Sequence, residues 1–205
     1  MQSNEYLRTS EHEDAVQSLE FVAEQVFMLE HDLYRWKWVI AALHNAAQGF
    51  MVLALCNGND LPVRTKENAV DWLKAYHLNS PTPEAKLDNF LNLYRKCKRD
   101  QYFNYLGSKP FQATPRHNSS FNDLNCFRND FTHFTPKGWS LRLEGLPEMV
   151  LDVLDLVHYF LAETTAILWY DQDLRTRARW AQRRIRRQMT NLSVFYKNER
   201  NRSAP

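Results

Sequence analysis

Apolar residues in the first quarter of the chain recur at every third or fourth position. From Glu11 to Leu55 there is no proline, and Gly49 is the only glycine. The apolar positions fall into two runs: Val16, Leu19, Val22, Val26, Leu29 and Leu33, followed by Val39, Ala42, Leu43, Ala46, Phe50 and Leu53. This spacing places each run on one face of a helix. The pattern predicts two long helices with a joint near residues 31–36, forming the first half of a helical bundle.

Shorter helical patterns and turn-forming segments alternate in the middle of the chain. Glycine and proline in NGNDLP, residues 57–62, are expected to end the second helix, and a short helix is expected over residues 66–76. Thr82 and Pro83 in SPTPEAK are typical of a helix start, because threonine caps well and proline is tolerated in the first turn. We expect this third helix to continue to about residue 105.

A long loop is predicted over residues 107–120, because GSKPFQATPRHNSS is rich in turn-forming residues. Ser120 or Asn122 would then cap a helix that runs through CFRNDFTHF, residues 126–134. Residues 135–138, which include a proline and a glycine, would close this helix.

The last third of the chain combines an alternating segment with two further helical patterns. In WSLRLEGLP, residues 139–147, apolar and polar residues alternate, which predicts a short strand or an extended arm. Pro147 opens a strongly apolar helix, and from Leu174 onward apolar residues still recur every three or four positions while arginine crowds the other faces. These patterns predict an all-α fold. We expect a helical bundle over residues 1–173 with one short extended insert, and a basic C-terminal helical extension over residues 174–205.

Charge is unevenly distributed along the chain, although the net charge is only +2. Residues 1–173 hold 16 Lys and Arg against 23 Asp and Glu, whereas residues 174–205 hold 10 against 1. A basic tail on an acidic body indicates contact with nucleic acid or with the acidic body of a second subunit. The apolar stripe of the tail favours a folded helix, whose arginines could follow phosphates, dock on the acidic body or meet an acidic antitoxin. Membrane-surface binding is least favoured, because the stripe has few large apolar residues.

Three cysteines are scattered along the chain without a CxxC pair, at Cys56, Cys97 and Cys126. This arrangement argues against a disulfide framework or a zinc site, so a cytoplasmic location, which is reducing, is expected. The polar, partly acidic N-terminus is not typical of a secretory signal. The most apolar segment, residues 38–55, is interrupted by polar side chains such as His44 and is expected to be a buried core helix.

The segment CFRNDFTHF presents aromatic and polar residues on different helical faces. At 100° per residue, one stripe contains Leu124, Phe127, Phe131 and Phe134. This stripe is the expected core face. Asn129 and His133 lie four positions apart on the opposite side, and Arg128 lies at the margin of the stripe, from which its long side chain can reach His133. Outward polar side chains are commonly only solvated, but the order of these three residues favours a functional role.

In that order of residues the segment resembles the HEPN superfamily, whose motif is an arginine, next a polar residue, and a histidine four to six residues after the arginine. Here the motif runs from Arg128 to His133 as RNDFTH. The resemblance implies a helical bundle in which the motif lies on a late helix, preceded by a long helical hairpin. This chain matches that order from about residue 13 to 170, while the insert over residues 139–147 departs from the minimal bundle.

The resemblance also implies an activity and partners. Many members of the superfamily are metal-independent endoribonucleases that work as homodimers, with the motifs of both subunits in one cleft. Some act as toxins in toxin–antitoxin or anti-phage systems. The expected function is therefore an endoribonuclease, with RNA as substrate, a second copy of the chain as partner, and an antitoxin or another protein as a further partner.

The chemistry of the motif side chains fits that activity. RNA can be cut without metal when its own 2′-hydroxyl attacks the adjacent phosphorus, which requires proton transfer near neutral pH and donors for the charged phosphoryl oxygens. His133 is the candidate general acid/base, Arg128 the phosphate stabiliser, and Asn129 the support that orients the imidazole or donates to the same phosphate. The expected products are a 2′,3′-cyclic phosphate and a 5′-hydroxyl. A two-fold dimer would supply a second His133.

Other candidate residues have simpler interpretations. His44 and His158 are expected to be hydrogen-bonded core or interface histidines, and not second catalytic groups. The basic patch RKCKRD, residues 95–100, lies between Tyr94 and Tyr102 and could follow an RNA backbone, but a solvated helix face is favoured. No His, Asp and Glu stand at metal-ligand spacing, so no metal or other cofactor is expected. The alternative function is a non-catalytic dimeric module that binds nucleic acid or protein.

Overall fold

The computed structural model describes residues 6–56, 60–103, 107–133, 136 and 138–203. Within these residues the chain forms seven α-helices and no β-strand. The α-helices are α1 (Glu11–Met28), α2 (Arg35–Leu55), α3 (Lys66–His77), α4 (Phe90–Cys97), α5 (Pro115–Thr132), α6 (Leu146–His158) and α7 (Gln172–Ser203). Two 3-10 turns, η1 (Leu61–Val63) and η2 (Asp100–Tyr102), and one π-helical turn, η4 (Tyr159–Glu163), complete the described elements. The all-α prediction is confirmed.

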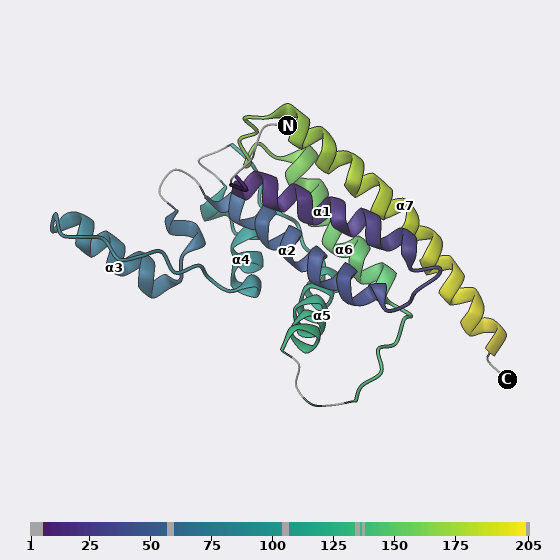
Figure 1. Cartoon of the computed structure of the whole chain (residues 1–205). Coiled ribbons are helices and arrows are strands. Elements are labelled where there is room, and N and C mark those ends of the chain that lie inside the picture. The colour runs from purple at the N-terminus through teal and green to yellow at the C-terminus, as the bar shows by residue number, and fades with distance from the viewer. Residues whose placement is uncertain (1–5, 57–59, 104–106, 134–135, 137, 204–205) are drawn as a thin grey trace.

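Helices α1 and α2 form the expected hairpin and lie side by side (Figure 1). α1 begins after Ser10, whose hydroxyl accepts a hydrogen bond from the backbone N–H of Glu13. The helices approach closely where Gly49 faces Ala15, because a β-carbon at position 49 would lie only 2.8 Å from that of Ala15. Residues 29–34 separate the two helices, within or beside the predicted joint.

Helix α2 is the central element of the bundle, in contact with α1, α4, α5 and α6. By length and composition it is the one described helix that could cross a membrane. However, 67% of its most apolar window is buried inside the protein. This burial is typical of a core helix, in agreement with the prediction for residues 38–55.

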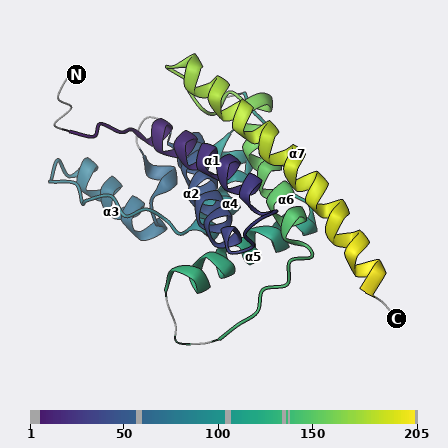
Figure 2. The same cartoon turned by 45° about the vertical axis from the view of Figure 1, so that its right-hand side comes forward.

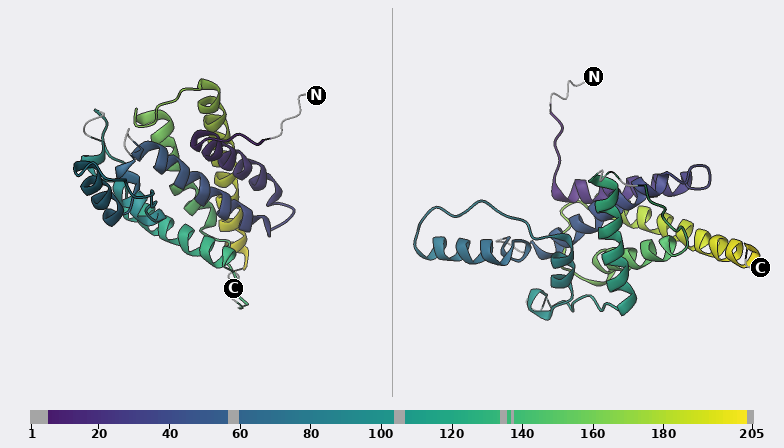
Figure 3. Two further views of the ribbon diagram at one scale, coloured as in Figure 1. Left: turned by 60° about the vertical axis from the view of Figure 1, so that its left-hand side comes forward. Right: turned by 90° about the horizontal axis from the view of Figure 1, so that it is seen from below.

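Helix α3 and the chain that follows it project from the bundle as an arm (Figures 1 and 3). α3 agrees with the helix predicted over residues 66–76 and is capped by Thr65, whose hydroxyl accepts the N–H of Asn68. The prediction of a helix from Pro83 is wrong. α4 begins only at Phe90 and ends at Cys97, and residues 104–106, near the predicted end, lie outside the described part of the chain.

Tertiary contacts explain why no helix starts at Pro83. The Asn68 side chain donates to the carbonyl oxygen of Glu84 at 2.9 Å and accepts the N–H of Lys86 at 3.1 Å. The Lys86 carbonyl oxygen in turn accepts the N–H of Thr65 at 2.9 Å. These backbone groups would bond within the segment if it were helical, so their engagement by α3 keeps it extended.

Helix α5 begins at Pro115, earlier than predicted, and neither Ser120 nor Asn122 caps it. The cap is Thr114, whose hydroxyl accepts the N–H of His117 at 3.3 Å. In return, the His117 ring accepts the N–H of Thr114 at 3.0 Å. This is a capping box with histidine in the place usually taken by Glu or Gln. The prediction of a loop up to residue 120 is therefore wrong in its last part.

The segment over residues 139–147 forms no strand. Its apolar side chains nevertheless face the protein: the Trp139 ring lies 4.8 Å from that of Phe131, and Leu141 and Leu143 are partly buried against the core. Alternation thus reflects packing on one side, while no described strand is present to pair with the backbone. Of the two predicted forms, the strand is wrong and the extended arm agrees with the structure.

Helices α6 and α7 complete the bundle, with α7 lying along α1 and α6 (Figure 2). The buried residues of α7 belong to the same core as those of α1, α2 and α6: Leu174, Ala178, Ala181, Ile185, Met189 and Leu192. The C-terminal helix is therefore packed on the body over most of its length. The division into two units at residue 173 stays a prediction.

The basic side chains of α7 contact groups of the same chain. Arg177 forms a two-pronged contact with Glu20, at 3.0 and 2.6 Å, and Arg186 donates to Asp155 at 2.7 Å. Further contacts are those of Arg175 and Arg179 with the carbonyl oxygen of Leu161, Lys197 with Glu148, and Arg200 with Glu144. Of the roles considered for this helix, docking on the acidic body is therefore seen, within one chain.

Candidate functional site

The motif segment lies on the last two turns of α5, at the edge of the core. Leu124 is fully buried, whereas Phe127 and Phe131 are only half-buried where they pack against the core. Phe134 lies outside the described residues. The predicted apolar stripe is thus confirmed at Leu124, and it opens toward solvent at the end of the helix.

Arg128 and Asn129 contact each other directly. The Nη1 of Arg128 donates to the Oδ1 of Asn129 at 3.0 Å, and both side chains are half-buried. The backbone carbonyl oxygen of Asn129 accepts the N–H of His133 at 3.0 Å. Asn129 therefore positions the guanidinium, where the sequence had suggested that it could orient the imidazole.

His133 is exposed and lies immediately after the last residue of α5. In the described part of the chain, no hydrogen bond joins its imidazole to Arg128 or Asn129. The structure thus brings Arg128 and Asn129 together and leaves the ring of His133 free for an outside group. Within one chain, the three residues do not form a closed constellation.

His44, on α2, is a buried neighbour of the motif that sequence reasoning had placed only in the core. It is 3% exposed, its ring stacks on Phe90 at 4.0 Å, and its Nε2 lies 3.4 Å from the Oδ1 of Asn125. The prediction of a hydrogen-bonded core histidine is confirmed. Burial, together with the positive charge of Arg128, lowers the pKa of His44 to about 4, so the ring is neutral at pH 7.

His158 is not a core histidine, so the core alternative of the prediction is wrong, while the interface alternative stays a prediction. Its side chain is 48% exposed, and its Nε2 lies 3.6 Å from a carboxylate oxygen of Glu163. It is the last residue of α6, where the apolar residues on either side of it turn inward and leave the imidazole on the outer face. The helical pattern alone did not show which of these neighbours faces the core.

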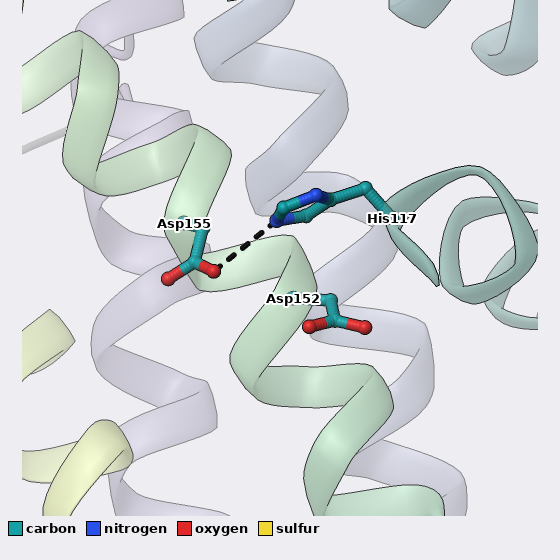
Figure 4. A group of neighbouring side chains, drawn as sticks. All are labelled: His117, Asp152 and Asp155. Carbon is teal, nitrogen blue, oxygen red and sulfur yellow. Dashed lines mark hydrogen bonds and ion pairs between the residues drawn. The ribbon is translucent and has the colours of Figure 1, made fainter. Parts of the chain in front are cut away.

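A cluster that sequence spacing missed joins α5 to α6. His117, Asp152 and Asp155 offer ligand atoms that all lie within 4.8 Å of one another. Figure 4 shows the imidazole reaching across to Asp155, with Asp152 one turn away on the same helix. Two aspartates three positions apart in the apolar helix LPEMVLDVLDLVH were the sequence signal, but their partner comes from another helix.

The hydrogen bonds of this cluster favour a structural role over a metal site. Because a backbone N–H can only donate, the Nδ1 of His117 is an acceptor, and the proton of the neutral ring lies on Nε2, facing Asp155 at 3.2 Å. A metal ligand would need that nitrogen unprotonated. Two arginines already balance the two carboxylates: Arg116 lies 2.7 Å from Asp152, and Arg186 lies 2.7 Å from Asp155.

An apolar groove lies beside the motif. It has a volume of about 390 Å³ and lies between the α1–α2 joint, the end of α5 and the extended segment over residues 139–145. Its lining side chains are Leu33, Tyr34, Trp36, Lys37, Phe131, Trp139, Leu141 and Leu143. Tyr34 is 72% exposed and Leu33 is 54% exposed. Large apolar side chains exposed together are typical of surfaces that bind another molecule.

Comparison with models of known protein families, with curated proteins and with solved structures found no match to this chain. The site is therefore defined by its own geometry: a paired Arg128 and Asn129, an exposed His133, and a buried neutral His44 behind them.

Proposed function

We propose that this chain is a metal-independent endoribonuclease of HEPN type, which cuts RNA by attack of the substrate's 2′-hydroxyl on the adjacent phosphorus. The observation that carries the proposal is the end of α5, where an arginine oriented by Asn129 lies five residues, about one and a half helical turns, before an exposed histidine. These are the two kinds of side chain that the reaction needs. A toxin or defence effector acting in the cytoplasm is the biological setting that we propose.

Each motif residue has a defined role in this reaction. A neutral His133 accepts the proton of the 2′-hydroxyl as that oxygen bonds to phosphorus. The bond from phosphorus to the 5′-oxygen breaks, and a protonated imidazole returns a proton to the leaving oxygen. Arg128 donates to the charged phosphoryl oxygens, and Asn129 holds its guanidinium in place. The products are a 2′,3′-cyclic phosphate and a 5′-hydroxyl.

The second imidazole is proposed to come from His133 of a second copy. A two-fold arrangement would bring two exposed histidines to one phosphate, which the open end of α5 allows. The apolar groove next to the motif supports this arrangement, because Phe131 lines the groove only two residues before His133. A second copy that covers the exposed Tyr34 and Leu33 would bury apolar surface beside the site.

The alternative function is a dimeric module that binds RNA or protein without cleavage. The separation of the His133 ring from Arg128 and Asn129 within one chain favours this alternative, since the site is then complete for binding but not for proton transfer. Labelled RNA incubated with the protein and EDTA distinguishes the two functions. Chelator-resistant cleavage that leaves a cyclic phosphate supports the nuclease, and binding without cleavage supports the alternative.

Two substitutions test the assignment of roles. His133→Ala is expected to abolish cleavage, and Arg128→Ala to lower kcat by about 10²- to 10³-fold, the usual loss for one donor to a charged transition state. His158→Ala is the matched control, because that histidine is also exposed but lies at the end of α6. Undiminished cleavage by His133→Ala, with its thermal melting unchanged, would contradict the proposal.

Oligomeric state tests the composite site. Sedimentation is expected to give a dimer. His133→Cys, in a chain with the exposed Cys56 and Cys126 changed to serine, is expected to form an intermolecular disulfide on mild oxidation. A monomer, or a dimer that fails to cross-link, would contradict the shared cleft.

A further inference from the structure

A second groove lies between α3 and α4, away from the motif. It has a volume of about 430 Å³, and five basic residues line it: Arg64, Lys66, Arg95, Lys96 and Arg99. Asp88 is the one acidic side chain among its lining residues, and Lys96 lies 2.7 Å from it. Four positive charges therefore remain without a carboxylate partner in the described part of the chain.

Arg64 makes this excess charge unusual. It is only 8% exposed, and its Nη1 donates to the amide oxygen of Asn68 at 3.1 Å and to the carbonyl oxygen of Pro83 at 3.4 Å. Both partners are neutral, and its Nε has no partner among the described residues. Buried charges are almost always paired, because removal from water is costly unless an opposite charge compensates. A buried guanidinium without a counter-ion points to an anion that binds from outside.

The other cations are placed to receive an extended anion. Arg95 lies in the last turn of α4, and Arg99 follows the end of that helix with an extended backbone; both side chains are exposed and both line the groove. Lys66 is exposed at the first turn of α3, across the groove. The cations that line the groove therefore come from both α3 and the region of α4.

Apart from Asp88 and Asn92, the other residues that line the groove are apolar or aromatic. Val70 and Leu73 from α3 are exposed by 43% and 40%, and Tyr102 also lines the groove. Arginine and tyrosine beside apolar surface suit nucleotide bases, which stack on flat or apolar groups while their phosphates meet the cations. An acidic peptide would match the positive charges of the groove but would not need these apolar and aromatic side chains.

We propose that the groove between α3 and α4 binds the phosphate backbone of single-stranded RNA, with Arg95, Arg99 and Lys66 at the phosphates and the buried Arg64 adding its charge beneath them. This inference rests on the proposed function in taking RNA as the ligand. The groove is firmly attached to the motif helix, because Tyr94 of α4 stacks on Phe121 of α5 at 3.8 Å with the rings 5° from parallel. RNA held here would be fixed relative to the helix that carries Arg128.

The test uses a fluorescent 12-nucleotide RNA in which every 2′-hydroxyl is methylated, so that the proposed reaction cannot occur and anisotropy reports binding alone. The test variant is Arg95→Ala with Arg99→Ala. The matched control is Arg183→Ala with Arg187→Ala, which removes two exposed charges from α7. All four side chains are exposed, and thermal melting checks that each variant is folded.

The test variant is expected to bind at least tenfold more weakly than the wild type at 0.1 M salt. The slope of log affinity against log salt should fall by about 1.4, since each single-strand phosphate contact contributes about 0.7. The control should change neither quantity by as much. Equal losses in both variants, or no loss in the test variant, would overturn the proposal. So would displacement of the RNA by polyglutamate as readily as by unlabelled RNA of equal charge, which would assign the groove to an acidic protein.

The groove and the nuclease can fail separately. If wild-type protein binds the methylated RNA through Arg95 and Arg99 but does not cut ordinary RNA, the groove stands and the nuclease proposal falls. If it cuts ordinary RNA with the same KM in the test variant as in the wild type, the nuclease stands and the groove falls.

Discussion

The two most basic regions of this chain, α7 and the α3–α4 groove, differ in what their cations contact. On α7, Arg177 binds Glu20 and Arg186 binds Asp155, and most other basic side chains are bound to carbonyl oxygens or carboxylates of the same chain. In the groove, Arg99 and Lys66 are exposed without a carboxylate partner among the described residues. α7 therefore carries more positive charges than the groove, but a larger share of them is already bound within the chain and is not available to a ligand.

The difference follows from where the acidic residues of the body lie. The apolar stripe of α7 seats it on α1 and α6, whose outer faces carry Glu13, Glu20 and Asp155 beside the arginines. Near α4 the only comparable carboxylate in the groove is Asp88, and Lys96 occupies it. A count of charges along a sequence thus says how strong a potential can be, and the packing decides how much of it remains for a partner.

The largest effect is expected from the apolar contact that seats α7. Ile185→Ala should lower the free energy of unfolding by roughly 2 to 5 kcal/mol, because Ile185 is fully buried in the common core. Urea denaturation measures the change. Arg187→Ala, an exposed position two residues away, should stay within about 0.5 kcal/mol. A loss below 1 kcal/mol or so for Ile185→Ala would mean that α7 is an appendage and not part of the body.

The next largest effect on stability is expected from the buried His44, whose pKa is lowered by burial and by the charge of Arg128. The folded protein binds fewer protons than the unfolded chain between the ordinary pKa near 6.5 and the lowered pKa of about 4. The contribution of the neutral His44 ring to the stability of the folded protein is therefore full above pH 6.5. It is lost as the pH falls toward 4, by about 3 kcal/mol in total. His44→Phe, which can keep the ring contact with Phe90, should remove this part of the pH dependence in urea melts at pH 7, 5.5 and 4.

The same pair of residues separates burial from charge. Arg128→Gln removes the positive charge, so the pKa of His44 should rise from about 4 but stay below 6.5, because burial is the larger cause. NMR titration of the ring protons measures the shift. A value unchanged by Arg128→Gln would show that the guanidinium does not act on His44, and a value of 6.5 would show that burial does not.

The ion pairs of α7 should have smaller effects on stability. Arg177→Ala is expected to cost about 1 kcal/mol, because its two-pronged contact with Glu20 is partly shielded from solvent but still close to the surface. The loss should shrink at 1 M salt, which screens surface charges. Glu20→Gln should lose a similar amount, and a double variant should lose little more than either single one.

The smallest effect on stability is expected in the groove. Arg99→Ala should change the free energy of unfolding by less than about 0.5 kcal/mol, since the side chain is exposed and has no ion-pair partner among the described residues. Urea denaturation of Arg99→Ala and of Arg177→Ala, carried out side by side, measures both changes in the free energy of unfolding. If Arg99→Ala costs as much as Arg177→Ala, the distinction between structural and available cations fails.

The sequence by itself determined the elements whose signals are local. The long apolar periods of α1, α2 and α7 lie within one helix each, so they could be read without knowledge of the neighbours. The position of the motif on a helix, its inward Leu124 and its exposed His133 follow from the same period. These features can be predicted from one sequence, because helical geometry alone fixes which residues share a face.

Helix ends were less predictable, because distant side chains compete for backbone hydrogen bonds. Asn68 holds Glu84 and Lys86 extended, where Thr82 and Pro83 predicted a helix. The start of α5 was readable in principle from Thr114, but a histidine in place of Glu or Gln hid the capping box.

Only the tertiary structure decided which charges are available and which polar groups meet. His44 and Arg128 are 84 positions apart, and His117 meets Asp155 from another helix. Such encounters depend on which faces of two helices pack together, and the period of either helix leaves that choice open. The sequence therefore established an all-α chain with an arginine–histidine motif. The packing decided that four basic side chains of α7 pair with carboxylates of the body, whereas Lys96 is the one cation of the groove that does so among the described residues.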